Sequence, residues 1–407
     1  MRQKLNAWKI TAIVLASIIG LFLVIVLGYV GYVVLQYNRI PDNQIVDMDN
    51  NQSLVMSVGD EYTIATYNVG FGAYDQEFDF FMDTGKLKDE HGGTDLQGTR
   101  GKAVSRENVI KNTKGSIDSL IDTFGEDGEL DFILFQEVDT KADRSHHVNQ
   151  YEMMREAYAP YNMGSYFAVN FHSANLLYPF HDPHGKSVAG LATFSKYKVN
   201  SSVRRQYPIS TAFSKFFDLD RCFVVSRVPV NGDKELVLIN SHMSAYDEGG
   251  VYRTAQLKML NDILASERQK GNYVIVGGDF NHDIADSKAT YPSWEVIPDE
   301  SVGGWLYQLF DGKNVVNKND PTHSDLAEGY TFATTLGDSQ DESVRIPTCR
   351  CCEMPYERDE NGMVKNYQAV LDGFIVSDNI EVKRVRNIDT DFKYSDHNPV
   401  KLIFALK

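Results

Sequence analysis

The fold is decided by one stretch of the sequence, Tyr273-Val274-Ile275-Val276-Gly277-Gly278-Asp279-Phe280-Asn281. It opens with a short apolar run, which is typical of a buried strand. Two glycines, an aspartate and an asparagine follow, and a buried strand would not choose such polar groups for packing. Because Gly and Asn are also common turn formers, the stretch alone is compatible with a tight turn. The rest of the chain decides between a turn and a functional group at the end of a strand.

The same pattern recurs along the chain. Three earlier apolar runs each end in polar side chains: Tyr62–Tyr67 in Asn68, Phe132–Phe135 in Gln136-Glu137, and Leu236–Ile239 in Asn240-Ser241-His242. Two later predicted strands are preceded by polar side chains instead. One strand follows Leu371-Asp372-Gly373, and the final strand follows Ser395-Asp396-His397-Asn398-Pro399. In layered α/β folds, ligands bind where strand ends converge. The six groups therefore predict one common site.

Helices are predicted between these strands, at Arg106–Phe124, Val148–Tyr158 and Tyr252–Gln269. In the last of these, Leu257, Leu260 and Leu264 fall on one face at the helical period. Strands interleaved with helices indicate a layered α/β domain. Two long polar segments, Phe71–Ala103 and Asp283–Asp325, interrupt the pattern, and loops of that size are usually functional or disordered.

The polar groups suit metal-assisted attack on phosphorus. Mg²⁺, with Mn²⁺ as a substitute, prefers carboxylate and amide oxygens, and three candidate ligands of that kind are Asn68, Glu137 and Asp396. Asp279 is a candidate to orient an attacking water, and Asn281 to hold a phosphoryl oxygen.

Two histidines, His242 and His397, are candidate donors to the negative charge of the transition state. A carboxylate behind His397 would fix its tautomer and favour its charged form, and Asp372 is the candidate. Each residue alone has a structural explanation, such as a strand cap, a turn or a satisfied core histidine. Six structural accidents in this order are much less plausible than one catalytic site.

Taken together and in order, these motifs resemble the endonuclease/exonuclease/phosphatase superfamily, which includes DNase I, apurinic endonucleases, inositol-polyphosphate 5-phosphatases and neutral sphingomyelinases. The resemblance covers about residues 60–405. It implies an α/β (α+β) fold, a four-layered sandwich of two mixed β-sheets flanked by helices. Gly190-Leu191-Ala192-Thr193-Phe194-Ser195 matches the family's Gly-hydrophobic-hydrophobic strand.

The resemblance also implies roles for the site residues. Asn68, Glu137 and Asp396 would lie in the metal site, His242 would contact the phosphate, Asp279 and Asn281 would position water and phosphate, and His397 would pair with Asp372. The gap of 69 residues between Asn68 and Glu137 is long for the family, so Phe71–Ala103 is interpreted as an insertion near the site. Asn170 falls where family members place substrate-contacting loops.

A histidine-rich middle segment adds a further candidate for substrate binding. Arg144 precedes Ser145-His146-His147, and His172, His181 and His184 follow later in the chain. Solvated loop histidines are one interpretation of this segment, and contact with an anionic head group is the other. Arg144 suits the same phosphate-facing role.

The N-terminal segment Ile10–Leu35 has 26 residues without a charge, enough to span a bilayer. A cleaved signal peptide usually has a shorter apolar region that ends in a small-residue site. The chain therefore divides into a basic tail (1–9), a transmembrane helix (10–36), a polar stalk (37–59) and a catalytic domain (60–407). Three bases before the segment and one after it predict a single-pass protein of the cell membrane, with a cytoplasmic N-terminus and an extracytoplasmic domain.

The remaining chain is strongly acidic. The net charge of the whole chain is −16 and the first 40 residues carry four bases and no acid, so the rest carries −20. Such a surface repels polyphosphate chains, and no Lys/Arg-rich run supplies a local basic patch. Nucleic acid is therefore the less favoured substrate.

Three of the four cysteines cluster at Cys349, Cys351 and Cys352. They could bind zinc together with a histidine, form a strained disulfide, pair with Cys222, or remain free. A structural or redox role is favoured because thiolates are the wrong ligands for a hard metal.

The sequence thus predicts a membrane-anchored, Mg²⁺-dependent phosphoesterase that acts on a phospholipid head group or another small phosphate ester. A surface endonuclease or exonuclease acting on DNA or RNA is the alternative. A non-catalytic binding protein of the same fold is disfavoured by the intact motifs. No protein partner can be inferred.

Overall fold

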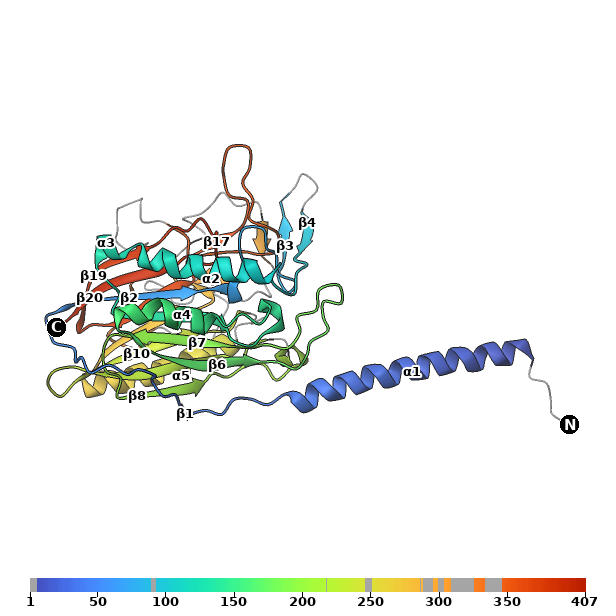
Figure 1. Ribbon diagram of the computed structural model, residues 1–407, viewed down its shortest axis with the longest axis horizontal. Helices are drawn as coiled ribbons and strands as arrows, with labels where there is room; N and C mark the ends of the chain where they lie inside the picture. Colours follow the sequence, from blue (N-terminus) through green and yellow to red (C-terminus); the bar gives the residue numbers. More distant parts are fainter. Residues whose placement is uncertain are drawn as a thin grey trace.

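The computed structural model describes residues 6–88, 93–216, 218–245, 251–285, 287, 296–298, 304–308, 326–333 and 346–407. Two mixed sheets face each other (Figure 1). The first sheet contains, in spatial order, β1 (Gln44–Ile45), β8 (Ser201–Gln206), β9 (Cys222–Pro229), β10 (Glu235–His242), β11 (Tyr273–Asp279), β18 (Asp372–Ser377) and β15 (Tyr330–Ala333). The second contains β19 (Ile380–Asn387), β20 (Val400–Leu406), β2 (Glu61–Asn68), β5 (Phe132–Asp139), β7 (Val188–Ser195) and β6 (Gly164–His172).

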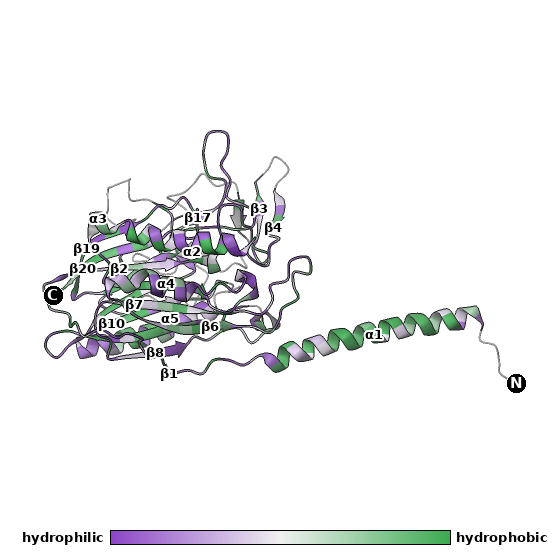
Figure 2. Cartoon of the chain, viewed as in Figure 1, coloured by the Kyte–Doolittle hydropathy of each residue, from purple (hydrophilic) through white to green (hydrophobic). Residues whose placement is uncertain are grey.

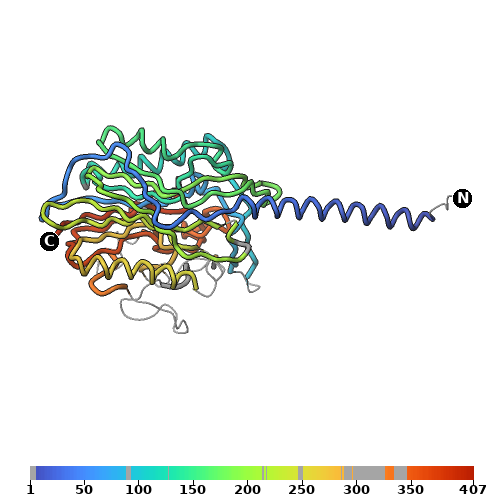
Figure 3. The backbone as a smooth tube through the Cα atoms, turned by 90° about the horizontal axis from the view of Figure 1, so that it is seen from below, coloured from blue at the N-terminus to red at the C-terminus, as the bar shows by residue number. Residues whose placement is uncertain are grey.

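Helices cover the outer faces of both sheets. α2 (Arg106–Ile121) and α4 (Gln150–Tyr158) pack on the second sheet, and α5 (Val251–Lys270) packs on the first. Figure 3 shows these helical layers on opposite sides of the sheets. The predicted four-layered sandwich of two mixed sheets is therefore confirmed.

Strict alternation along the strands builds the layers. In β2, Ile64 points into the core between the sheets while Ala65 faces the helices. In β10, Leu238 lies in the same central core and Ile239 packs toward α5. Since both faces of these strands are covered, both alternating sets are apolar, which is why the strands read as continuous apolar runs.

The helices begin close to where the sequence predicts. The side chain of Ser105 caps α2 by accepting a hydrogen bond from Asn108 N (3.1 Å), and Asn149 caps α4 by accepting from Glu152 N (3.2 Å). Shorter elements are α3 (Phe124–Asp127), η1 (Gly70–Gly72), η2 (Asp143–Ser145), η3 (Ala159–Tyr161), η4 (Phe213–Phe216), β3 (Thr84–Leu87), β4 (Thr94–Gln97), β12 (His282–Asp283), β13 (Val296–Pro298), β14 (Gly304–Gln308), β16 (Cys349–Arg350) and β17 (Gln368–Ala369). Most of the predicted loop Asp283–Asp325 lies outside the described residues.

An apolar helix, α1 (Ala7–Gln36), extends away from the domain at the N-terminus (Figure 2). It is long and apolar enough to cross a membrane, and almost all of its side chains are exposed. The segment 37–59, expected as a polar stalk, follows the surface of the domain. Within it β1 adds to the edge of β8, and Met56 is fully buried.

Candidate active site

The predicted strand ends converge on one cavity. The parallel pairs β2–β5 and β10–β11 bring Asn68, Glu137, His242 and Asp279 to the same end of the sandwich. The start of β18 and the segment before β20 contribute Asp372 and His397. The cavity is lined, among others, by Glu137, Arg144, Arg221, Asp279, Asn281, Asp396 and His397.

Glycine at position 278 lets Asp279 reach the cavity. Gly278 pairs with Ser241 in the parallel ladder at φ +152, and a Cβ on it would lie 1.9 Å from the carbonyl oxygen of Ser241. Beyond it, Asn281 adopts φ 52, and its amide N donates to Oδ1 of Asp279 (2.7 Å). This tight turn therefore holds the carboxylate and the Asn281 amide together at the end of the strand.

Asp279 lies at the centre of the site. Its Oδ2 is 2.9 Å from Nδ2 of Asn68, 3.4 Å from Nε2 of His242 and 3.8 Å from Nε2 of His397. Burial raises the pKa of Asp279 to about 6, against the lowering effect of the charged His397. A carboxylate so placed can accept a proton from a water molecule near neutral pH.

His397 is held by a second carboxylate. Its Nδ1 lies 2.7 Å from Oδ2 of Asp372, and both side chains are almost fully buried. Burial disfavours the charged ring, but Asp372, Asp396 and Asp279 outweigh it and raise the pKa of His397 well above its usual range. The structure thus brings together the predicted His397–Asp372 pair.

Glu137 and Asp396 face the same part of the cavity as like charges. Burial raises the pKa of Glu137, and the negative charge of Asp396 raises it further. Glu137 sits at a β-bulge with φ 54, a strained conformation for a non-glycine residue. Glu137 is partly exposed and Asp396 is buried, and both offer the carboxylate oxygens that a divalent cation prefers.

Asn68 takes a different orientation from the one expected of a metal ligand. Its Oδ1 accepts a hydrogen bond from the amide of Gly70 (3.0 Å), while Nδ2 faces Asp279 and Glu137. In this rotamer Asn68 positions the two carboxylates rather than offering its oxygen to an ion.

Arg221 is a site residue that the sequence prediction missed. Its Nη1 donates to Nε2 of His242 over 2.5 Å, and Nη2 donates to Asp218 (3.1 Å). Since a guanidinium always donates, Nε2 of His242 must accept, and burial together with Arg221 lowers the pKa of His242 well below its usual value. His242 is therefore neutral here, and Arg221 is the cation beside it.

The two predicted substrate contacts differ in their placement. Arg144 lines the cavity, is fixed by two hydrogen bonds to Asp139 (3.0 and 2.8 Å), and lies 4.0 Å over the ring of Phe71. Asn170, on β6, is fully buried and is not among the residues that line the cavity. Neither polar atom of its amide has a hydrogen-bond partner among the described residues.

The segment interpreted as an insertion forms a wall of the cavity. Phe71, Tyr74 and Phe80 from this segment line it and pack edge to face or tilted on one another. His184 packs against Phe71, with ring centroids 6.4 Å apart, and also lines the cavity. Burial lowers its pKa to about 3, so this histidine is a neutral wall residue, whereas His181 is exposed.

The cysteine cluster lies on the Nε2 side of His397, opposite Asp372. All four cysteines are free and buried. Sγ of Cys349 is 3.4 Å from Nε2 of His397, and Sγ of Cys352 is 3.7 Å from Oδ2 of Asp396. Cys349, Asp396 and His397 present ligand atoms within 4.8 Å of one another, so this geometry is compatible with a metal as well as with free thiols.

Comparison with known proteins agrees with this geometry. The sequence matches the Endonuclease/Exonuclease/phosphatase family over residues 65–397. No curated protein matches the chain. The fold is similar to ANGEL2, a 2′,3′-cyclic phosphatase solved with adenosine-2′,3′-vanadate, at 14% identity and a TM-score of 0.51, covering 91% of this chain and 99% of that one.

A bacterial structure shows the same likeness. An endonuclease/exonuclease/phosphatase from Beutenbergia cavernae DSM 12333 is 13% identical with a TM-score of 0.50, covering 85% of this chain and 72% of that one. At such identities the likeness shows the fold alone, whereas the sequence match extends over most of the chain and covers every residue that lines the cavity. The chain therefore belongs to the endonuclease/exonuclease/phosphatase family of phosphoric ester hydrolases.

Proposed function

We propose that this chain is a membrane-anchored, Mg²⁺-dependent phosphoesterase that acts outside the cytoplasm on a lipid head group or another small phosphate ester. One observation carries the reaction. The carboxylate of Asp279 lies within 3.8 Å of two imidazoles, one neutral (His242) and one charged (His397), in a cavity that also holds two arginines.

Asp279 would orient the attacking water and accept its proton as the new oxygen–phosphorus bond forms. Asn281 would hold a phosphoryl oxygen beside it. His397, kept charged by Asp372, would donate to the negative charge that builds up while the ester bond to phosphorus breaks. These steps need a carboxylate at Asp279, whose pKa of about 6 leaves it ionised at neutral pH, and an imidazolium at His397, which the surrounding carboxylates stabilise.

Glu137 and Asp396 would hold the divalent cation, with Asn68 positioning Glu137. The cation would supply positive charge to the phosphate and so lower the repulsion that an anionic substrate meets in this acidic cavity. Arg144 and Arg221 would add two donors for phosphate oxygens. The unpaired amide of Asn170 is fully buried away from the cavity lining, so a buried water is the partner that it would take, because a buried amide rarely lacks partners.

The anchor favours a lipid substrate over nucleic acid. α1 meets the length requirement of a membrane span, and the excess of bases before it (three, against one after it) favours a domain outside the cytoplasm. Apart from the first 40 residues the chain has a net charge of −20, which disfavours a long polyanion.

The test uses the full-length chain in detergent micelles with sphingomyelin, phosphoinositides, adenosine 2′,3′-cyclic phosphate and plasmid DNA. Each substrate is assayed with Mg²⁺ and with a chelator, and His397→Ala serves as the blank. Chelator-sensitive release of a phosphorylated head group without cleavage of DNA is the expected result. Cleaved DNA with untouched lipid would mean a surface nuclease instead, and equal turnover by His397→Ala would refute the site.

A further inference from the structure

The loop that joins β6 to β7, residues 173–187, carries an exposed apolar tip. Leu177, Tyr178 and Phe180 are 43%, 44% and 83% exposed. The three residues are almost adjacent in sequence, so they form one patch rather than scattered exposed side chains. Exposed apolar patches of this kind mark contact with a partner or a membrane.

This loop is bonded to α1. The hydroxyl of Tyr29 donates to the carbonyl of Asn175 (3.1 Å) and accepts from the amide of Leu177 (2.9 Å). The hydroxyl of Tyr32 accepts from the amide of Asn175 (3.2 Å). Three hydrogen bonds thus hold the tip of the loop against the turn of α1 that carries Tyr29 and Tyr32.

This turn of α1 coincides with the expected edge of the bilayer. Lys9 is the last charge before the apolar segment. About 20 residues cross the hydrocarbon core, so the 26-residue segment Ile10–Leu35 spans it with some tilt, and Tyr29 and Tyr32 lie in the last two turns of that segment, next to the domain. Tyrosine rings are enriched at this boundary. Leu177, Tyr178 and Phe180 therefore lie at the height where aromatic and apolar side chains enter the head-group region.

The opposite side of the loop packs against the wall of the catalytic cavity. Tyr178 packs against Phe81, with ring centroids 5.5 Å apart. Asp182 accepts hydrogen bonds from the amides of Gly101 and Lys102, and Nδ1 of His184 lies 2.7 Å from the carbonyl of Gly101. Because His184 also lines the cavity, the apolar tip and the catalytic site are joined by one short, tightly bonded segment.

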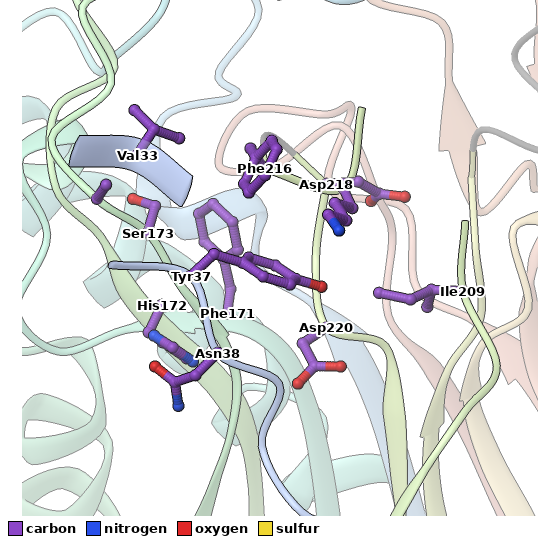
Figure 4. Close-up of a pocket in the computed structure, with 12 residues that line it drawn as sticks. Val33, Tyr37, Asn38, Phe171, His172, Ser173, Ile209, Phe216, Asp218 and Asp220 are labelled. Carbon is purple, nitrogen blue, oxygen red and sulfur yellow. The ribbon is translucent and has the colours of Figure 1, made fainter. Parts of the chain in front are cut away.

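A second pocket lies between the end of α1 and the domain (Figure 4). Val33 of α1 and Tyr37, the residue after α1, line it together with Phe171 of β6 and Phe216, and the ring of Tyr37 packs edge to face on that of Phe216 with centroids 5.0 Å apart. Asp218 lines both this pocket and the catalytic cavity. Figures 1 and 3 agree that α1 leaves the domain at the end where β3, β4 and the strand ends of the site lie.

We propose that Leu177, Tyr178 and Phe180 insert into the head-group layer of the bilayer that α1 crosses, so that the catalytic cavity opens at the lipid surface. The proposal rests on the anchoring of α1 proposed above. The occupant of the patch is lipid rather than a second copy of the chain, because the hydrogen bonds to Tyr29 and Tyr32 place the patch beside a membrane span. The substrate phosphate would then reach the site without leaving the membrane surface.

The experiment uses the full chain reconstituted in phosphatidylcholine/phosphatidylglycerol vesicles. The photoreactive residue p-benzoylphenylalanine replaces Phe180, and in a matched control it replaces Met363, which is 47% exposed in the loop between β16 and β17. After irradiation, the mass of the intact chain is measured. We expect a mass increase of one phospholipid at position 180 and none at position 363.

Two results would overturn the proposal while leaving the anchor in place. One is a chain that floats with the vesicles but gives no lipid adduct at position 180. The other is an adduct with the mass of two chains, which would identify a second copy as the occupant. A chain that alkaline carbonate strips from the vesicles would refute both the anchor and the docking. Hydrolysis is not part of the readout, so failure of the proposed enzymatic activity would be seen separately.

Discussion

The imidazole of His397 is clamped by Asp372, whose Oδ2 lies 2.7 Å from Nδ1, so that Nε2 points toward Asp279 at 3.8 Å. Thr348 anchors the start of this strand, since its hydroxyl accepts hydrogen bonds from the amides of Leu371 and Asp372. Oδ1 of Asp372 has no partner among the described residues, so its interaction with His397 is the main constraint on this carboxylate. The pair therefore fixes both the direction and the charge of the catalytic ring.

Replacing Asp372 with asparagine should lower kcat far more than it raises KM. The amide cannot stabilise the imidazolium, so the ring loses its preferred tautomer and charge while the cavity keeps its shape. The loss of such a supporting partner typically costs about 10- to 100-fold in activity. Steady-state kinetics check this, with Asp262→Asn on the exposed face of α5 as control. A rise in KM at constant kcat would contradict the proposed role.

Arg221 is predicted to bind the phosphate, and Arg227, on the strand β9 that begins one residue after Arg221, provides a matched comparison. Arg221→Met removes a charge 2.5 Å from His242, whereas Arg227→Met removes a partly exposed ion pair with Glu235 and Glu267. Loss of a transition-state donor costs about 10²–10³ in kcat, so we expect that decrease for Arg221→Met alone. Arg227→Met should lower the melting temperature and leave the kinetics unchanged. Identical kinetics in both variants would remove Arg221 from the site.

Much of the fold and site is predictable because both depend on local patterns. Glu137 and Asp279 each follow an apolar run, and a charged group at the end of a buried strand is itself the signal. The four layers follow from the alternation of short apolar strands with amphipathic helices. Residues that act through such motifs can be named from the sequence.

The missed residues depend on pairings between distant segments. Arg221 reaches His242 because Cys222 pairs with His242 across two antiparallel strands, a register that no local pattern records. The antiparallel β9–β10 hairpin is the signal that could have identified it. Cys349 meets His397 through an isolated bridge between segments 48 residues apart. The polar segment 37–59 reads as a free linker because its partner, the edge of β8, lies far away in the sequence.

Gly278→Ala should destabilise the chain through a backbone clash. The added Cβ would lie 1.9 Å from the carbonyl oxygen of Ser241, and φ +152 is unfavourable for alanine. Overpacking costs about 1–3 kcal/mol, so the free energy of unfolding should fall by at least about 2 kcal/mol. Denaturant unfolding of the detergent-solubilised chain measures it. Gly125→Ala is the control, because no atom lies within 4 Å of its new Cβ. Equal stability of both variants would contradict the close pairing of Gly278 with Ser241.

The cysteines should resist alkylation in the native chain. Burial raises the pKa of Cys349, Cys351 and Cys352 well above the usual thiol value, and that of Cys222 to about 12. Only the thiolate reacts, so iodoacetamide at pH 8 should label the chain only after denaturation. Met363→Cys supplies an exposed thiol that confirms the reagent is active. Rapid labelling of the native wild-type chain would show that the cluster is accessible and reactive.

The titration of Glu353 should lower the free energy of unfolding as pH rises. The side chain is 3% exposed, and burial raises its pKa from 4.5 to about 7, although Cys351 and Arg350 oppose the rise. The folded chain therefore binds this proton more tightly than the unfolded chain does. Its contribution to stability is complete below about pH 4.5 and is lost as pH rises to about 7.

Glu353→Gln removes this titration and keeps a neutral side chain of similar shape. The upward displacement of the pKa from 4.5 to about 7 corresponds to roughly 3 kcal/mol. We therefore expect the variant to gain about that much stability relative to the wild type between pH 4.5 and pH 7. Glu353→Asp retains the carboxyl group and should retain the dependence on pH. Denaturant unfolding at a series of pH values measures the difference, and parallel curves for Glu353→Gln and the wild type would mean that Glu353 is charged in the folded chain.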